Sequence, residues 1–254
     1  MHINALKRKL QAGETVYGPF MCASHGSFVE IVGLAGFDFA ILDMEHGPLE
    51  VQTVEELCRA AHGANLTPIV RVRKNDAPQI QRALDIGSSG VQVPQIETGQ
   101  EAAAAVRAAK YAPLGMRGIS LYTRAGDYTV FGPEGITDRL NAEQLVIVHV
   151  EGVRGLENLD EIVAVPNIDV IFLGPYDLSQ SFGIPGQVND PRVVKGMEQA
   201  VVKIRAAGKA AGTFAKDAAT AKRWFGVGVQ YMSVGPDVGL WADACNRLLR
   251  EIKG

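Results

Sequence analysis

The chain has 254 residues, a formal net charge of −3 and three cysteines. This length is typical of one (β/α)8 barrel, so we expect a single domain over residues 1–254. The charge shows no basic excess, which argues against a nucleic-acid partner, and no apolar run approaches the roughly 18 residues that cross a bilayer, which argues against a membrane partner. An odd number of cysteines without metal-binding spacing favours a reducing, cytoplasmic location.

Short β-rich runs alternate with helical patterns along the chain. Strands are predicted at residues 16–23, 39–44, 68–72, 90–94, 145–150, 169–173, 210–214 and 231–234. Helices are predicted at residues 28–34, 54–62, 77–85, 99–109, 156–165, 191–207, 218–225 and 241–252. Eight strands in strict alternation with helices predict an α/β fold, a closed (β/α)8 TIM barrel. Continuous Val, Ile and Leu runs fit strands that are covered on both faces.

One connection breaks this rhythm. Residues 111–141 form a much longer segment than an ordinary helix-to-strand loop and contain Arg117, Arg124 and Tyr128. Long segments of this kind usually serve as lids or as interface elements. The sequence leaves both interpretations open: a lid over a site, or a surface that packs on a neighbouring subunit.

Carboxylates follow three of the apolar strand runs. Asp43 closes the apolar stretch at residues 37–42, Glu151 follows the strand at 145–150, and Asp177 comes after the strand at 169–173. The carboxyl ends of parallel barrel strands hold the catalytic face, so these side chains are expected to lie together. Hard cations such as Mg2+ and Mn2+ prefer a few carboxylates. The pattern predicts Glu151 and Asp177 as metal ligands, with His149, on the same side of its strand as Glu151, as a neighbouring group or an extra ligand.

Other residues at these strand ends indicate how a substrate would be handled. Arg71 ends the run Pro68-Ile69-Val70, and its planar guanidinium suits an oxyanion or a carboxylate. His46 suits proton transfer near neutral pH, and Asp43, three residues earlier, would hold its ring in one tautomer. Gly174 and Pro175 precede a predicted helix start, whose backbone N–H groups would receive a substrate carboxylate.

These residues carry a resemblance to a known family. The motifs are Asp43-Met44-Glu45-His46-Gly47-Pro48, Val70-Arg71-Val72 with Asn75-Asp76, Arg82-Ala83-Leu84-Asp85-Ile86-Gly87, Arg117-Gly118, Glu151 and Gly174-Pro175-Tyr176-Asp177-Leu178-Ser179. In this order, over nearly the whole chain, they resemble the HpcH/HpaI aldolases, the metal-dependent class II pyruvate aldolases. The resemblance implies an enzyme that reversibly cleaves a 4-hydroxy-2-oxo acid or a 2-keto-3-deoxy sugar acid to pyruvate and an aldehyde.

The resemblance also implies roles for individual residues. Glu151 and Asp177 would bind a divalent metal (Mg2+, Mn2+ or Co2+). Arg71 would hold the keto or enolate oxygen, and His46 with Asp43 would act as the acid/base pair. Contacts with the substrate are expected from Arg71, His149, Gly174, Pro175, Tyr176, Asp177, Gln95 and Phe214.

A further implication of the resemblance is a homo-oligomer. The family's last helix is exchanged between subunits, and its dimers assemble into a hexamer, a trimer of dimers. Asp85 matches a catalytic position that approaches the neighbouring subunit's site. The small-molecule substrate is the other expected partner.

This chain departs from the family pattern at a few positions. His149 stands where the family often has Gln, and Lys74 stands where it often has Trp. Tyr176 and Gln95 replace residues that are commonly smaller or apolar. Such changes would alter the preference for the aldehyde or perturb the metal, and they leave the enolate-forming residues in place.

Other functions stay open on the sequence alone. A Schiff-base aldolase needs a lysine at a strand end, which Lys216 or Lys74 would provide. The same enolate chemistry would serve oxaloacetate decarboxylation without any aldehyde. A third alternative is a barrel without catalytic activity, in which the long segment and the last helix serve assembly.

Overall fold

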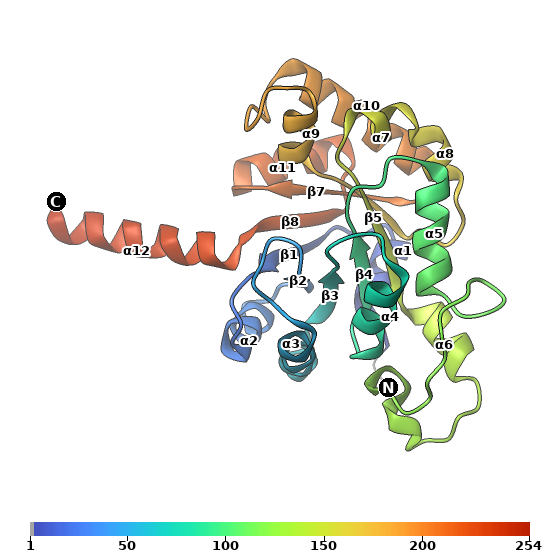
Figure 1. Cartoon of the computed structure of the whole chain (residues 1–254). Coiled ribbons are helices and arrows are strands. Elements are labelled where there is room, and N and C mark those ends of the chain that lie inside the picture. Colours follow the sequence, from blue (N-terminus) through green and yellow to red (C-terminus); the bar gives the residue numbers. More distant parts are fainter. Residues whose placement is uncertain (1–2) are drawn as a thin grey trace.

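Eight parallel strands close into a barrel in the order of the chain, and helices surround it (Figure 1). The computed structural model describes residues 3–254. The strands are β1 (Val16–Met21), β2 (Phe39–Asp43), β3 (Thr67–Arg71), β4 (Gly90–Val93), β5 (Leu145–Val150), β6 (Val170–Leu173), β7 (Ala210–Ala215) and β8 (Tyr231–Pro236). The predicted (β/α)8 barrel is confirmed.

The helices follow the predicted pattern with a few differences. They are α1 (Ala5–Gln11), α2 (Gly26–Leu34), α3 (Val51–Gly63), α4 (Ala77–Asp85), α5 (Gly99–Ala109), α6 (Ile136–Glu143), α7 (Val153–Glu157), α8 (Leu159–Ala164), α9 (Pro175–Ser181), α10 (Pro191–Ala206), α11 (Ala218–Val227) and α12 (Asp237–Lys253), with a 3-10 helix η1 (Arg124–Thr129). The helix predicted at 156–165 is divided at Asn158, whose side chain donates to the Glu97 carbonyl at 2.8 Å. Helices α6 and η1 lie in the long segment, where none was predicted.

Alternation along each strand divides the apolar side chains between two cores. Phe39 and Ile41 of β2 belong to the cluster inside the barrel, whereas Ala40 and Leu42 belong to the cluster between strands and helices. This follows from the two-residue period of a strand. Both faces of the strands are apolar because both are buried. Each large aliphatic side chain that is buried stabilises the fold by about 1.5–3 kcal/mol.

Helix α1 closes the barrel at the amino ends of the strands. Its Leu6 and Leu10 are buried in the interior cluster. Asn4 accepts a hydrogen bond from the Lys7 backbone N–H at 3.0 Å, and its side-chain amide donates to the Ser89 carbonyl at 2.9 Å. These contacts fix α1 against the loop before β4. The carboxyl ends of the strands are therefore the end at which a site can open to solvent.

The long segment between α5 and β5 lies at the closed end. Lys110 is 2 % exposed and donates from Nζ to the carbonyls of Asn141 at 2.8 Å and Gln144 at 2.6 Å; burial lowers the pKa of Lys110 to about 8. Tyr111 and Ile136 pack together in a small cluster of their own. Because the segment leads into the amino end of β5, it does not form a lid over the carboxyl ends within one chain. The interface interpretation remains a prediction.

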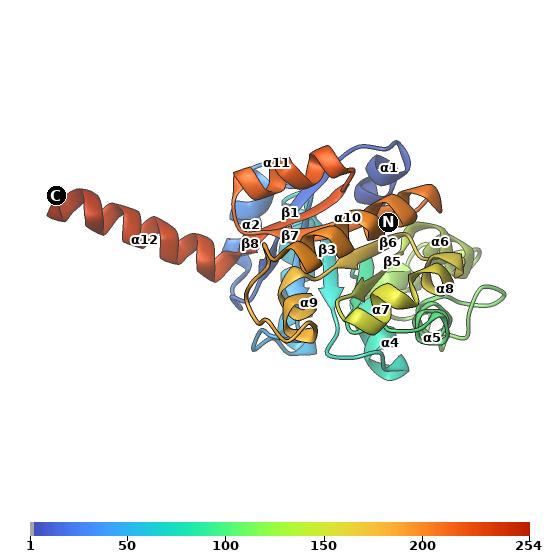
Figure 2. The same ribbon diagram turned by 90° about the horizontal axis from the view of Figure 1, so that it is seen from above.

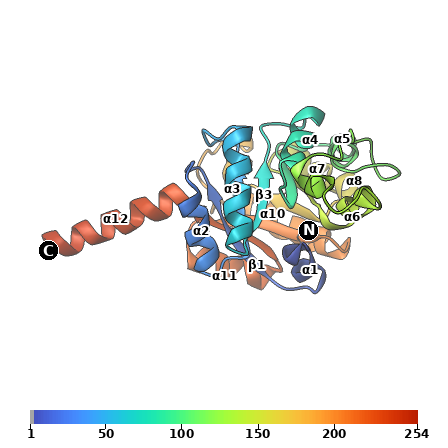
Figure 3. The same ribbon diagram turned by 90° about the horizontal axis from the view of Figure 1, so that it is seen from below.

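The last helix, α12, extends away from the barrel in all three views (Figures 1, 2 and 3). Its first residue, Asp237, is buried and accepts hydrogen bonds from the backbone N–H groups of Cys22 at 3.0 Å and Ala23 at 2.8 Å. Beyond it, apolar side chains such as Trp241 and Ile252 are exposed. No helix among residues 3–254 is both long and apolar enough to span a membrane.

Substitution of Gly18 should destabilise the barrel wall. A Cβ at Gly18 would lie 2.1 Å from the Phe39 carbonyl oxygen on β2, and β1 shifts register against β8 between Gly18 and Phe20. We expect Gly18→Ala to lower the free energy of unfolding by at least about 1–3 kcal/mol, measured by urea unfolding. The control is Gly63→Ala at the end of α3, where a Cβ meets nothing within 4 Å. Equal losses in the two variants would contradict this account.

Candidate active site

An arginine bound to two carboxylates forms the centre of the open end. Arg71, the last residue of β3, donates from Nε to Asp43 Oδ1 at 2.8 Å and from Nη2 to Asp43 Oδ2 at 2.6 Å. Its Nη1 lies 3.0 Å from Glu45 Oε2. The register of β2 and β3 places Asp43 directly beside Arg71, and the guanidinium lies 4.5 Å from the centroid of the Phe20 ring. The result is a buried positive charge in a fixed orientation.

Glu45 lies in this group, although no role was predicted for it. Its side chain is nearly enclosed, and besides contacting Arg71 it accepts a hydrogen bond from the Gln95 side-chain amide at 3.3 Å. Burial raises the pKa of Glu45 to about 7; Arg71 opposes this rise, and the charges of Glu151 and Asp43 add to it. The sequence did hold a signal for Glu45: it stands two residues after Asp43, and in an extended chain two such side chains point to the same side.

Glu151 follows β5 and is held from two sides. Its Oε1 accepts from the Gln95 backbone N–H at 2.9 Å, and its Oε2 lies 3.0 Å from His149 Nδ1. Burial opposes ionisation, but His149 and the Gln95 N–H outweigh it and lower the pKa of Glu151. Gln95 has a φ of +56°, a left-handed conformation that is uncommon outside glycine and often found at functional sites. A Cβ on Gly174 would lie 2.6 Å from Glu151 Oε2, so glycine keeps the space beside that oxygen open.

Asp177 and His46 lie at the exposed rim of the same site. Asp177 is in the first turn of α9. Burial and the charge of Glu151 raise the pKa of Asp177, while His46 and Arg71 oppose this rise. Such influences are short-ranged, so these four residues share one site. Asp43 accepts a hydrogen bond from the His46 backbone N–H at 3.3 Å; because its carboxylate also binds Arg71, the pairing of Asp43 with the His46 ring remains a prediction.

Aromatic side chains form a wall that begins beside Arg71. The ring centroids of Phe20 and Phe214 are 6.3 Å apart, and those of Phe214 and Tyr176 are 5.8 Å apart in an edge-to-face arrangement. Tyr176 and Phe214 also line a small cavity of about 30 Å3 together with Pro175 and Lys216. Phe214 and Tyr176, which were predicted to contact substrate, therefore continue the row of rings that begins with Phe20 on Arg71.

Asp85 is not brought into this group within one chain. It is the last residue of α4, and its carboxylate lies 2.5 Å from an Nη atom of Arg117 in the long segment. Its approach to the site of a neighbouring subunit stays a prediction.

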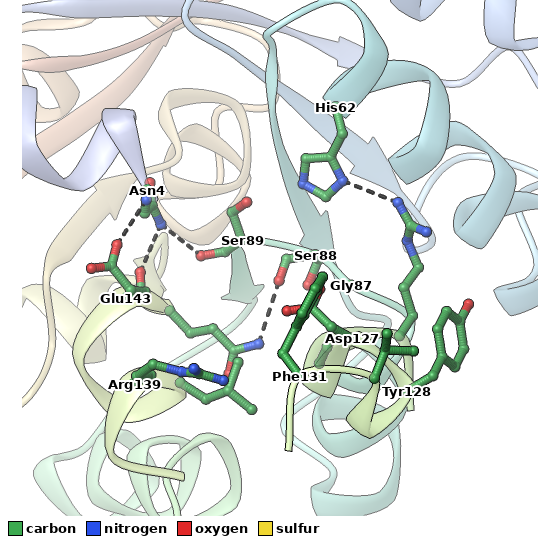
Figure 4. Close-up of a pocket in the computed structure, with 15 residues that line it drawn as sticks. Asn4, His62, Gly87, Ser88, Ser89, Asp127, Tyr128, Phe131, Arg139 and Glu143 are labelled. Carbon is green, nitrogen blue, oxygen red and sulfur yellow. Dashed lines mark hydrogen bonds between the residues drawn. The ribbon is translucent and has the colours of Figure 1, made fainter. Parts of the chain in front are cut away.

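A different cavity lies at the closed end of the barrel (Figure 4). It has a volume of about 320 Å3 and is lined by the loops before β4 and β5, by η1 and by α6, with Ser88, Phe131 and Arg139 among its residues. His62 Nδ1 lies 3.3 Å from the Arg124 guanidinium at its edge. Because the strand-end carboxylates and Arg71 do not line it, this cavity is not the candidate active site.

The open-end residues fit a divalent cation that shares its coordination with a substrate. Among residues 3–254, no cluster of three or more His, Cys, Asp or Glu side chains is arranged to hold a metal. Glu151 and Asp177 offer two carboxylates at one open site, and a cation between them would relieve the repulsion from Glu151 that adds to the effect of burial in raising the pKa of Asp177. Mg2+ is commonly held by one or two carboxylates plus water and substrate oxygens.

Fold and site together define a (β/α)8 barrel with a buried arginine and two carboxylates suited to a metal on its catalytic face. Residues 17–244 match the model of the HpcH/HpaI aldolase/citrate lyase family. The pyruvate aldolase of Rhizobium etli is 38% identical over 94% of this chain and 94% of that protein. The 2-keto-3-deoxy-L-rhamnonate aldolase of Klebsiella pneumoniae is 35% identical over 98% of this chain and 93% of that protein.

A solved structure agrees with these sequence matches. The crystal structure of an HpcH/HpaI aldolase/citrate lyase family protein from Burkholderia cenocepacia superposes with a TM-score of 0.94 at 33% identity, covering 99% of this chain and 100% of the other. The chain belongs to the HpcH/HpaI aldolase/citrate lyase family. The family predicted from the motifs is confirmed, and the prediction of a carbon–carbon lyase is supported.

Replacing Glu45 should change stability in a pH-dependent way. Its pKa is about 7 in the folded protein because of burial, and near the ordinary glutamate value when unfolded. The folded state binds more protons between these values, so stability is lost as the pH rises through about 7. The substitution Glu45→Gln removes this ionisable group. In chelator-treated protein, its effect on the free energy of unfolding should be about 1–3 kcal/mol more stabilising at pH 8 than at pH 5.

Urea unfolding at the two pH values measures this difference. Glu50→Gln is the matched control, because the Glu50 side chain is 68% exposed. The same Glu45→Gln effect at pH 5 and pH 8 would show that burial does not perturb the Glu45 carboxyl.

Proposed function

We propose that the protein is a class II, metal-dependent aldolase that reversibly cleaves a 4-hydroxy-2-oxo acid, or a 2-keto-3-deoxy sugar acid, to pyruvate and an aldehyde. The observation that carries the proposal is the buried Arg71, held by Asp43 and Glu45 beside the carboxylates of Glu151 and Asp177. This arrangement suits an oxygen that becomes negatively charged during reaction. The aldolase relatives support it, since two of them carry names that specify aldol cleavage.

In the cleavage direction, Arg71 holds its positive charge at the 2-oxo oxygen, where the enolate charge develops. His46 accepts the proton of the C4 hydroxyl. The C3–C4 bond then breaks, its electron pair forms the enolate of pyruvate, and the aldehyde leaves. Return of the proton from His46 to C3 gives pyruvate and regenerates the base. A divalent cation (Mg2+, Mn2+ or Co2+) held by Glu151 and Asp177 would supply Lewis-acid stabilisation of the negative charge.

The aromatic wall is the proposed contact for the aldehyde half of the substrate. Tyr176 and Phe214 lie beyond Phe20 as seen from Arg71, so they meet the part of the substrate distal to the reacting carbonyl. Gly174 and Pro175, at the start of α9, would present backbone N–H groups of its first turn to the pyruvate carboxylate.

We also propose a homo-oligomer, a trimer of dimers in which α12 is exchanged between subunits and Asp85 approaches the neighbouring site. Support comes from α12 itself, whose exposed Trp241, Leu248 and Ile252 lie on a helix that extends from the barrel. A cytoplasmic location is in keeping with its free cysteines.

Metal dependence is the first test of the proposal. Pyruvate release from a panel of 4-hydroxy-2-oxo acids is measured with EDTA-treated protein before and after addition of Mg2+, Mn2+ or Co2+. We expect activity only after the metal is restored. Activity that ignores EDTA, with trapping of pyruvate by borohydride at Lys74 or Lys216, would replace the metal mechanism with a Schiff base. Release from oxaloacetate alone would favour a decarboxylase.

His46→Ala should abolish most aldol cleavage and leave metal binding intact. Loss of a general base typically costs about 100- to 10,000-fold in kcat. The measurements are kcat for pyruvate release and Mn2+ affinity by calorimetry. The control is His25→Ala, since His25 is also a histidine beyond a strand end but caps α2 by accepting from the Ser27 N–H. An unaltered kcat in His46→Ala would remove His46 from the proposed role.

A further inference from the structure

Four side chains form a hydrogen-bonded chain from Glu151 into the barrel interior. Glu151 Oε2 lies 3.0 Å from His149 Nδ1, and His149 Nε2 lies 2.5 Å from Gln92 Nε2. Gln92 Oε1 lies 3.2 Å from the Tyr231 hydroxyl. His149 is 1 % exposed, and Gln92 and Tyr231 are fully buried. Because these residues come from β5, β4 and β8, the chain crosses the barrel beneath the candidate metal site.

The direction of each hydrogen bond follows from the atoms that can donate. As the Gln92 amide is placed, its nitrogen faces His149 Nε2 and its oxygen faces the Tyr231 hydroxyl; because an amide nitrogen only donates, Nε2 accepts in this arrangement. A histidine that accepts at Nε2 carries its proton on Nδ1 and donates it to the Glu151 carboxylate. At the other end, burial raises the pKa of the Tyr231 phenol, which stays protonated and donates to the Gln92 oxygen. Every bond therefore points from Tyr231 toward Glu151.

Stacking fixes the rings that take part. The His149 ring stacks on Phe172 with centroids 4.4 Å apart and an interplanar angle of 19°. Tyr231 stacks on Phe39 at 4.1 Å and 14°. Packing at this density leaves little room for a ring to rotate. The Nδ1–H of His149 is thus held on Glu151 Oε2.

We propose that His149, Gln92 and Tyr231 are positioning residues that orient the Glu151 carboxylate for a divalent cation, with His149 donating from Nδ1 to Glu151 Oε2. The inference rests on the proposed function, because it takes Glu151 as a cation ligand. Each oxygen of Glu151 receives one hydrogen bond, from the Gln95 N–H or from His149, and each keeps a lone pair for the cation. A carboxylate that is ordered beforehand loses less conformational entropy when the cation binds.

The affinity of the chelator-treated protein for Mn2+, measured by calorimetry, tests the positioning role. His149→Leu removes the donor and should weaken binding about 10- to 100-fold, the usual effect of losing a group that orients a metal ligand. His149→Asn keeps an N–H donor close to the position of Nδ1 and should recover most of that loss. Tyr231→Phe, two bonds away, should have a smaller effect than His149→Leu.

Two further variants make the outcomes distinguishable. Ser233→Ala is the matched control: Ser233 is buried on β8 two residues after Tyr231, its hydroxyl has no hydrogen-bond partner among residues 3–254, and its loss should leave the affinity unchanged. Glu151→Gln tests the ligand itself. Equal Mn2+ binding by the wild type and Glu151→Gln would defeat the proposed function. If Glu151→Gln loses binding while His149→Leu keeps wild-type affinity, the positioning role alone is overturned.

The tautomer has a direct readout that does not depend on the metal. Nitrogen NMR of 15N-histidine-labelled protein, with His149→Asn to assign the signals, should show a proton on His149 Nδ1. A ring that carries its proton on Nε2 alone would have no donor for Glu151 and would overturn the positioning role of His149. This measurement uses the wild-type protein and decides the question even if His149→Leu fails to fold.

Discussion

Excess negative charge around Arg71 constrains the rest of the open end. Asp43 and Glu45 contact the guanidinium, and Glu151 and Asp177 lie close enough to influence it or be influenced by it. One guanidinium cannot neutralise four carboxylates, and burial makes each unbalanced charge costly. The structure responds with a raised pKa at Glu45 and Asp177, and with hydrogen bonds that keep Glu151 ionised. A cation and the polar end of a substrate would complete this balance.

The two ends of the barrel carry different tasks. At the amino ends, Leu6 and Leu10 of α1 close the interior, and Lys110 ties the long segment to the backbone before β5. At the carboxyl ends, short loops present Gln95 and Gly174 to Glu151. Barrel enzymes commonly separate stability from chemistry in this way. The long segment contributes to the packing of the closed end, and it leaves apolar side chains such as Phe131 exposed.

Much of this architecture could be predicted because its causes are local. The continuous apolar run from Phe39 and the helical spacing of the apolar residues in α4 are both visible in the sequence. Other features depend on contacts between distant residues: the break at Asn158 follows from its bond to Glu97, and the left-handed Gln95 follows from the position of Glu151. The periodicity of apolar residues along the chain does not indicate such contacts.

The candidate site also has features that the sequence indicates and features that depend on contacts between distant residues. The strand-end rule brought Asp43, Arg71, Glu151 and Asp177 together correctly, because parallel strands end at one face whatever their side chains do. The rule does not indicate how the carboxylates divide their contacts, because it gives only the strand end at which each side chain lies. The register of β2 and β3 places the Asp43 carboxylate on Arg71, a contact that the sequence did not indicate, and the expected pairing of Asp43 with the His46 ring stays a prediction.

The interior of the barrel extends the site below its visible rim. Polar side chains in a core are costly unless every hydrogen bond is made, and the barrel keeps Gln92, His149 and Tyr231 together in one connected chain. An apolar trio of similar volume would fill the same space, so packing alone does not explain them. What they share is a connection that ends on Glu151. We therefore interpret His149, Gln92 and Tyr231 as an extension of the catalytic face, connected to it through Glu151.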